Sequence, residues 1–361
     1  EDKLLVRVVG AFHDRDGYTR DVVWNKDRDD EHWYSGRIGI TFKPTETIEN
    51  YTMAYGSKAS NNGSGFIHKG YNIAGLTALN MCYEGPTVPN AIASCDVYRA
   101  ATAQADALGP RQTALGIDIF SRTKTWGVTN TTDIELNDEL TLRNIVSFQK
   151  LKLDYAYDSD GTILQQHEVD PNRLPGVGQV VLPGDGTPLT YLNASDPGFP
   201  RDDLKQFTEE LQLQGSALDK NLTYTVGGFY YDQRPNGTQA GSAIVYCPAA
   251  FTGSNIVCRP NRSTYGTKQT SKALYAQATF DFGAVSAALD GLRFTGGYRH
   301  TWDKISGFAS AYTPQADGVS AKCGSTGPAA PPVPLATAAA DCTYTAELNS
   351  KASTWLIGLD Y

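Results

Sequence analysis

Residues 292–303 read LRFTGGYRHTWD, and two kinds of side chain alternate along these twelve positions. The even positions carry mostly apolar or aromatic side chains, whereas the odd positions carry Arg, Thr, Gly and Asp. An alternation with a period of two places successive side chains on opposite faces of a β-strand. We therefore predict a long strand with one apolar and one polar face.

The same alternation recurs along the chain, less regularly in some segments. Together with Leu292–Asp303 it predicts ten strands, the other nine being Leu4–Asp14, His32–Phe42, Thr47–Ser57, Thr125–Ile134, Leu140–Tyr157, Leu204–Ala217, Asn221–Gln233, Leu274–Phe282 and Ala352–Tyr361. Within Leu140–Tyr157 the apolar register changes between Phe148 and Leu151, which predicts a β-bulge.

The connections between these ten strands alternate between short and long. The short ones are Pro44–Glu46, Glu135–Asp138, Leu218–Lys220 and Gly283–Asp290, and every other connection is much longer. Consecutive antiparallel strands place the odd-numbered and even-numbered connections at opposite ends of the sheet. One rim therefore has short turns, and the other carries large loops. Outer-membrane barrels have this arrangement, whereas soluble sandwiches have strands of about five or six residues. The sequence predicts an all-β, transmembrane, antiparallel up-and-down barrel.

Composition agrees with this fold class and excludes others. The 361 residues are 40% hydrophobic and include 35 Gly and 18 Pro, which favours strands and turns over helices. No apolar run is long enough for a transmembrane helix of about 18 residues or more. The formal net charge of −8 argues against a nucleic-acid partner, whose phosphates attract a basic surface.

Six cysteines form three couples that are close in sequence. They are Cys82 with Cys95, Cys247 with Cys258, and Cys323 with Cys342. Each couple falls within one long connection, so local disulfides in an oxidising compartment are the simplest interpretation, with other pairings and free thiols as alternatives. None has the spacing of a zinc site, and we expect no bound metal.

No catalytic motif is present, and we expect neither an enzymatic activity nor a cofactor. Five arginines lie opposite the apolar register of their strands, so we predict that they point into the barrel lumen: Arg7, Arg37, Arg143, Arg293 and Arg299. A lumen-facing arginine can contact an anionic ligand or a domain that fills the barrel, or pair with acids such as Asp133, Glu135, Glu210 and Asp303.

Four segments resemble barrel strands of TonB-dependent outer-membrane receptors. They are residues 36–44 (GRIGITFKP, followed by Glu49, Asn50 and Tyr51), 207–213 (FTEELQL), 226–231 (VGGFYY) and 292–299 (LRFTGGYR). The resemblance implies a 22-stranded barrel closed by an N-terminal plug domain. It also implies the import of a scarce nutrient, such as a ferric siderophore, haem or cobalamin, driven by the inner-membrane TonB complex.

From the resemblance we expect residues 1–361 to be a partial barrel domain, an internal fragment without the plug domain, the signal peptide and the remaining strands. The expected location is the bacterial outer membrane, with its lipid as one partner. The expected function is TonB-coupled uptake, most simply of a ferric siderophore, with TonB acting through the absent plug. The family's ligand-binding residues lie in variable loops and in the plug, so none can be transferred.

Two other classes of function remain open at this stage. The first is a complete ten-stranded outer-membrane barrel whose loops carry a surface enzyme site. The second is a soluble, secreted β-rich protein that binds glycans or adheres to surfaces, a reading that N-x-S/T sequons at positions such as Asn193 and Asn236 favour.

Overall fold

The computed structural model describes most of the chain. The described residues are 3–78, 82–85, 93–116, 118–158, 161–162, 169–170, 179–181, 192–195, 200–246, 257–314, 319–324 and 331–361. The side chains of a few residues within these ranges, including Cys82 and Cys258, are not described.

Ten long strands form the body of the molecule, which confirms the predicted fold class. They are β1 (Leu4–Arg15), β4 (Glu31–Phe42), β5 (Ile48–Asn61), β9 (Phe120–Asn137), β10 (Leu140–Asp158), β14 (Asp202–Ala217), β15 (Leu222–Pro235), β17 (Val257–Asp281), β18 (Arg293–Pro314) and β21 (Thr343–Asp360). Each overlaps one of the ten predicted segments.

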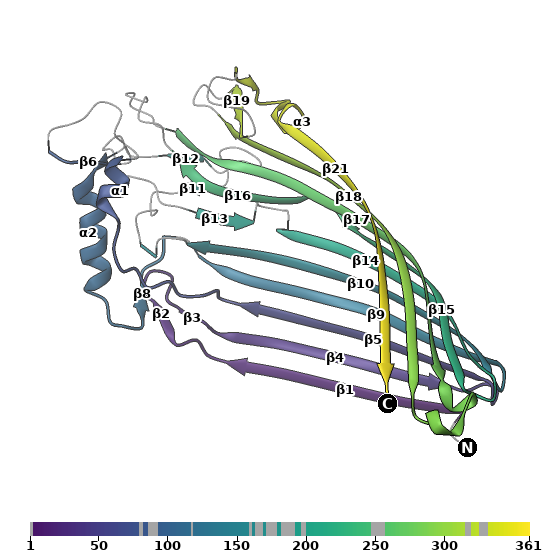
Figure 1. Ribbon diagram of the computed structural model, residues 1–361. Helices are drawn as coiled ribbons and strands as arrows, with labels where there is room; N and C mark the ends of the chain where they lie inside the picture. Colours follow the sequence, from purple (N-terminus) through teal and green to yellow (C-terminus); the bar gives the residue numbers. More distant parts are fainter. Residues whose placement is uncertain are drawn as a thin grey trace.

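The ten strands pair in sequence order, and every pair is antiparallel. Figure 1 shows the sheet bending into an open trough with β1 and β21 at its two edges. Among the described residues these two edge strands do not pair with each other. The ten strands therefore form a curved sheet of the barrel type that is not closed.

The connections sort by length as predicted. Residues 43–47, 138–139, 218–221 and 282–292 join strands at one rim, and the other connections lie at the opposite rim. Figure 1 shows the tight turns gathered near the end labelled N and the α-helices and small strands at the far end. We call these the short-turn rim and the long-loop rim. At the short-turn rim Leu218, Asp219 and Lys220 all have positive φ (54°, 54° and 70°), a backbone conformation that reverses the chain tightly.

Two details of the prediction were wrong. The strands β17, β18 and β21 run well beyond the predicted segments at the long-loop rim, because pairing with each other holds them extended where side-chain alternation is weak. The pairing of β10 with β9 is continuous past Phe148, and its irregularity lies between Leu140 and Thr141. Leu151 and Tyr155 instead face the interior near the long-loop rim, where Arg201 donates a hydrogen bond to the Tyr155 hydroxyl (3.1 Å).

Short elements occupy the connections. The small strands are β2 (Thr19–Asp21), β3 (Lys26–Arg28), β6 (Cys82–Tyr83), β7 (Ala93–Ser94), β8 (Gln112–Thr113), β11 (Val169–Asp170), β12 (Gln179–Val181), β13 (Leu192–Ser195), β16 (Gln239–Tyr246), β19 (Ser320–Cys323) and β20 (Val333–Pro334). The helices are α1 (Ile73–Ala78), α2 (Cys95–Asp106), α3 (Ala338–Asp341) and the 3₁₀ turns η1 (Phe282–Ala284) and η2 (Ala287–Leu289). No helix in the described part of the chain is both long and apolar enough to span a membrane.

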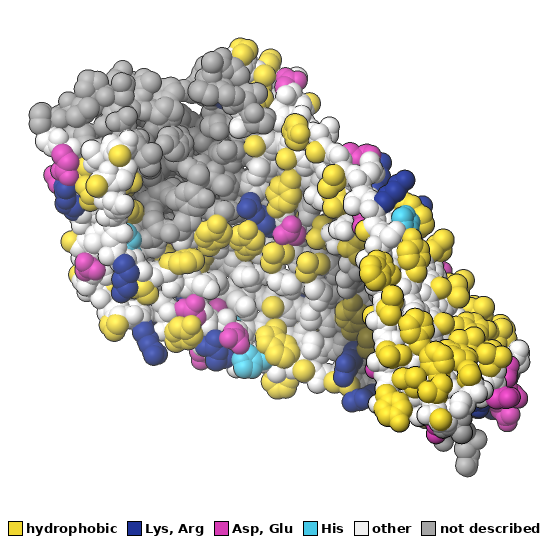
Figure 2. Space-filling model, in the orientation of Figure 1, with side chains coloured by type: hydrophobic (Ala, Val, Ile, Leu, Met, Phe, Trp, Pro, Cys, Tyr) yellow, Lys and Arg dark blue, Asp and Glu magenta, His cyan; other side chains and the backbone are white. Residues whose placement is uncertain are grey.

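The two faces of the sheet differ in chemistry, because the continuous register carries the alternation from strand to strand. One face, which we call the apolar face, exposes large hydrophobic side chains including Val8, Ile38, Trp126, Leu211, Val226, Leu274, Tyr298 and Trp355. The opposite polar face carries Ser57, Thr129, Gln149, Gln212, Thr225, Gln277, Thr295 and Thr354. Figure 2 shows hydrophobic side chains gathered over the lower parts of β18 and β21 on the outside of the trough.

The cysteine predictions are met as far as the described residues extend. Cys323 and Cys342 form a disulfide and lie in a small core with Tyr312, Ala321 and Ala338. Cys95 is also disulfide-bonded and packs against Tyr98. Cys247 and the side chains of Cys82 and Cys258 lie outside the described residues, so both remaining pairings stay predictions.

Tyrosine rings lie close to glycines of neighbouring strands. A Cβ atom placed on Gly227 would be 2.4 Å from the ring of Tyr275, its direct cross-strand partner. A Cβ atom on Gly127 would be 2.6 Å from the hydroxyl oxygen of its partner Tyr55. Glycine lacks the side chain that would block this approach, so the rings cover backbone that would otherwise be open.

We expect Gly227→Ala to lower the free energy of unfolding by roughly 1–3 kcal/mol, because the new methyl group displaces the Tyr275 ring. Gly297 is a matched control on the same face, since its Cβ would meet nothing closer than 3.5 Å. Urea titration of the protein in lipid vesicles measures both variants. Equal unfolding free energies would contradict the ring packing.

Candidate functional site

The five arginines predicted to share a face do so. Arg7 lies opposite Gly39, two residues from Arg37 on the same side of β4. Arg143 lies opposite Gln212, and the register continues from Gln212 through β15 and β17 to Arg299. Arg293 lies six residues before Arg299 on β18. All five therefore lie on the polar face, although spread over four strands.

Two of these arginines pair with carboxylates of the neighbouring strand. Arg143 donates two hydrogen bonds to Asp133, at 2.6 and 2.8 Å, a bidentate ion pair across β9 and β10. Arg293 donates one hydrogen bond to Asp281 at 3.1 Å, close to the short-turn rim. These contacts neutralise both guanidinium groups locally, so neither is a free anion-binding group.

Arg299 belongs to a different arrangement that also contains aromatic rings. Its guanidinium carbon lies 5.3 Å from the ring centre of Phe229 and 5.6 Å from that of Tyr275. The Tyr275 hydroxyl donates a hydrogen bond to Glu210, which also accepts one from Gln212 (2.9 Å). The Arg299 Nε donates a hydrogen bond to the Thr301 hydroxyl (3.3 Å), so cation–π contact leaves only its two terminal nitrogens available to other groups, while Glu210 is occupied by neutral donors.

Arg7 and Arg37 have no ion-pair partner among the described residues. Arg37 lines a groove of about 550 Å³ on the polar face. Its other lining residues are polar (Ser35, Tyr55, Ser57, Thr129), apolar (Val9, Ala11, Met53) and two glycines (Gly36, Gly56). The Tyr55 hydroxyl donates a hydrogen bond to Gln149 (3.0 Å), which orients it along the same face. This groove combines one positive charge and several hydroxyl groups with a mostly apolar wall, a set that suits a ligand with both an anionic group and an apolar part.

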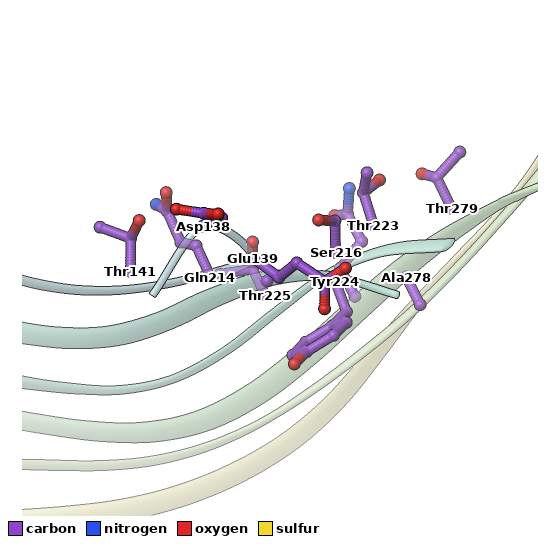
Figure 3. Close-up of a pocket in the computed structure, with 12 residues that line it drawn as sticks. Asp138, Glu139, Thr141, Gln214, Ser216, Thr223, Tyr224, Thr225, Ala278 and Thr279 are labelled. Atoms are coloured by element: carbon purple, nitrogen blue, oxygen red, sulfur yellow. The ribbon is translucent and has the colours of Figure 1, made fainter. Parts of the chain in front are cut away.

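A second hollow lies near the short-turn rim and has a different character. It has a volume of about 390 Å³ and is lined by Thr and Gln side chains together with Asp138 and Glu139. Figure 3 shows Thr141, Gln214 and Thr279 on one side of the sheet and the Tyr224 ring on the other. The lining offers hydrogen bonds but no positive charge, so it disfavours an anion.

At the long-loop rim a buried ion-pair network joins two loops. The fully buried guanidinium of Arg28 donates to Asp21 (2.7 and 3.0 Å), also fully buried, and to the carbonyl oxygens of Asn62 (2.7 Å) and Ile119 (2.9 Å). Asp118 accepts further hydrogen bonds from the same group at 3.2 Å. The network holds β2 and β3 against the ends of β5 and β9.

Helix α2 is held to its neighbouring turn by exposed charges. The Arg99 guanidinium donates hydrogen bonds to Glu84 and to Asp96, the latter at 2.9 Å. These two carboxylates raise the pKa of Arg99 above its ordinary value, with Glu84 the larger cause. Within the described ranges no group of three or more His, Cys, Asp or Glu side chains is arranged to hold a metal ion.

A protein-family model supplies the classification. The model described as "TonB dependent receptor-like, beta-barrel" matches residues 83–321. The chain belongs to this family. The resemblance noted in the sequence is therefore confirmed, and the ten-stranded sheet is of the TonB-dependent receptor barrel type. No curated protein sequence matches the chain significantly.

Solved structures of similar fold agree with this family. The ferric yersiniabactin uptake receptor FyuA from Yersinia pestis matches with a TM-score of 0.54 and 12% identity, over 99% of this chain and 40% of its own. The siderophore receptor PiuA from Acinetobacter baumannii has a TM-score of 0.52 and 14% identity, over 99% and 43%. The ferric-catecholate import receptor Fiu from E. coli K12 has a TM-score of 0.54 and 16% identity, over 99% and 48%.

These structural similarities establish the fold. Sequence identities of 12–16% carry no information about the ligand. The chain spans less than half the length of each of these three receptors. Barrels of the family lie in the outer membrane and act as transporters rather than enzymes. The apolar face of the TonB-dependent receptor sheet corresponds to the lipid-facing side of such a barrel, and the polar face to the lumen.

Sequence reasoning named the arginines and, among the acids that could pair with them, Asp133, which pairs with Arg143. It missed Asp281, the partner of Arg293, and the aromatic rings beside Arg299. Tyr275 and Phe229, which hold Arg299, lie on the polar side of their strands, where an aromatic residue is a departure from the alternation. That departure from the alternation could have identified both aromatic residues from the sequence. The Arg28 network joins residues up to 91 positions apart, and no local pattern marks it.

We expect Arg28→Met to destabilise the loop that contains β2 and β3 by about 3–5 kcal/mol, because Asp21 would keep a buried charge without its partner. The rate of proteolysis in residues 16–30 of the folded protein measures this opening. Arg20→Met is the matched control, since the ion pair of Arg20 with Asp27 is exposed and contributes about 1 kcal/mol or less. Equal rates of proteolysis in residues 16–30 for the two variants would contradict a structural role for Arg28.

Proposed function

We propose that this TonB-dependent receptor is an outer-membrane protein that takes up a scarce nutrient, a ferric siderophore, by TonB-coupled active transport. Family membership carries the proposal. Three receptors of similar fold, described as a ferric yersiniabactin uptake receptor, a siderophore receptor and a ferric-catecholate import receptor, support the choice of ligand class.

The chemistry of the two faces supports the membrane location. An exposed apolar face on strands whose backbone groups pair with their neighbours suits hydrocarbon, since lipid offers no hydrogen bonds. The disulfide Cys323–Cys342 at the long-loop rim fits the oxidising outside of the cell. In this orientation the long loops meet the ligand and the short-turn rim faces the periplasm.

The polar face supplies a path for an anionic ligand. Arg37 is the strongest candidate contact, because it lines a groove and has no ion-pair partner in the described part of the chain. Arg299 offers the two terminal nitrogens of its guanidinium, and Arg7 lies beyond the groove on β1. Arg143 and Arg293 serve mainly to hold adjacent strands through Asp133 and Asp281.

Transport is tested in cells that express the intact protein and lack other siderophore receptors. We expect TonB-dependent accumulation of ⁵⁵Fe supplied as a catecholate, hydroxamate or phenolate siderophore complex, and no accumulation when TonB is deleted. Parallel accumulation assays with haem and with cobalamin would show whether the protein takes up one of these nutrients instead. The proposal fails if no iron complex accumulates, or if accumulation is independent of TonB.

For the siderophore that is accumulated, we expect Arg37→Gln to raise the half-saturating concentration roughly tenfold, the effect of losing one charge-assisted hydrogen bond of about 1.5 kcal/mol. Arg293→Gln should leave it nearly unchanged, because that arginine is paired and lies near the short-turn rim. Concentration dependence of ⁵⁵Fe uptake measures both. Equal half-saturating concentrations for the two variants would show that Arg37 does not contact the siderophore during uptake.

A further inference from the structure

One carboxylate lies within the apolar part of the apolar face. Glu209 of β14 is exposed on this face, between Leu211 and Phe207, the neighbours along the strand that share the face. The next charged side chain toward the long-loop rim on this side of β14 is Lys205, four residues away, which is roughly 13 Å along the strand at about 3.3 Å per residue. Glu209 therefore lies where the face is otherwise suited to lipid.

Glu209 has no cationic partner in the described part of its own chain. Its carboxylate accepts one long hydrogen bond, of 3.4 Å, from the neutral amide of Asn144 on β10, and it forms no ion pair there. Other polar side chains of this face satisfy one another, since the amides of Asn50 and Asn130 exchange hydrogen bonds of 3.1 and 3.2 Å. A charge at membrane depth is costly and is normally paired, so Glu209 needs a cation from elsewhere.

A cation of the same kind of environment lies two strands away. Glu209 is directly opposite Tyr230 on β15, and Tyr230 is directly opposite Lys272 on β17, so the two charges flank the tyrosine at about 5 Å on either side. The Lys272 ammonium nitrogen lies 6.0 Å from the ring centre of Tyr230, so this side chain extends toward β15. Lys272 is exposed and forms no ion pair with any described residue. We call Glu209, Tyr230 and Lys272 the charged row.

The nearest acid to the charged row along β15 is already neutralised. Asp232 forms ion pairs with Arg234 (3.1 Å) and with Lys268 (3.9 Å). Neither Asp232 nor its two partners is therefore available to Lys272 or Glu209. The charged row thus presents one negative and one positive group, both without a partner in the described structure, on the two sides of one aromatic ring.

We propose that the charged row is the centre of an interface between two copies of this chain in the membrane. A two-fold axis along the membrane normal, passing beside Tyr230, keeps both copies in the same orientation and at the same depth. It places Glu209 of each copy opposite Lys272 of the other, so both ion pairs form together. The exposed side chains of Leu211, Val226 and Leu274 surround the row and supply apolar contact.

This pattern favours a second copy over other occupants of the face. The row is self-complementary in charge about its own centre, which a surface intended for an unrelated partner has no reason to be. Lipid hydrocarbon offers no cation to Glu209. The inference rests on the proposed membrane location, and not on nutrient uptake or TonB coupling.

The test measures fluorescence energy transfer between donor-labelled and acceptor-labelled copies of the intact protein in phosphatidylcholine vesicles. We expect the unchanged protein to dimerise. Glu209→Lys alone and Lys272→Glu alone each place like charges opposite one another, and each should weaken the dimer roughly 30-fold. An equal mixture of the two variants should restore the dimer, because every contact between unlike variants again joins opposite charges.

The matched control is Lys124→Glu, which changes the net charge by the same amount as Lys272→Glu. Lys124 lies on the same face but on β9, away from the charged row, and directly opposite Lys58 and Lys152. We expect the dimer of this control to be as tight as that of the unchanged protein.

Cross-linking locates the axis without changing any charge. A residue beside a two-fold axis faces its own copy, so Tyr230→Cys should form a disulfide-linked dimer when the vesicles are mildly oxidised. Val128→Cys, on the same face of β9, should not.

Several results would overturn the inference. These are an unchanged protein that stays monomeric in the vesicles, a single charge variant that dimerises as tightly as the unchanged protein, or a mixture of the two variants that stays monomeric. If the charge variants fail to fold, the cysteine comparison decides the question, and equal cross-linking at both positions or none at Tyr230→Cys would reject the interface. Failure of the protein to float with lipid vesicles would instead reject the membrane location.

Discussion

The antiparallel backbone pairing that runs without a break from β1 to β21 is the constraint on which the rest of the structure depends. A strand alternates its side chains between two faces, and an unbroken register transmits that alternation to every neighbour. One slip of a single residue would exchange the apolar and polar faces of all strands beyond it. The same pairing satisfies the backbone hydrogen bonds, which an apolar surround cannot do.

The charged side chains of the two faces of this sheet have different kinds of neighbour. On the polar face arginines are neutralised by acids in the next strand, as Arg143 is by Asp133, or are supported by aromatic rings, as Arg299 is. On the apolar face Lys124 lies directly opposite both Lys58 and Lys152, while carboxylates such as Asp203 lie on the same face. A cross-strand pair of opposite charges stabilises the sheet, whereas like charges directly opposite each other destabilise it.

The predictability of individual elements follows the strength of the alternation. Leu292–Asp303 is part of a strand because its two faces differ over the whole stretch. The first half of β17 was assigned to a loop, because above the apolar band neither face is selected for hydrophobicity and the signal fades. The predicted bulge in β10 was wrong for the same reason: Leu151 is apolar but turns inward, where the interior near the loops is packed.

The sequence by itself determined the fold class, the ten strands, the alternation of short and long connections, and the face on which each arginine lies. All of these depend on a local period of two along each strand and on the direction of the chain. Tertiary structure alone decided which arginines are paired, how Arg28 joins two loops, and that Lys58, Lys124 and Lys152 form one row. Those relations depend on the register between strands distant in sequence, and a change of register by two residues preserves the alternation while changing every partner.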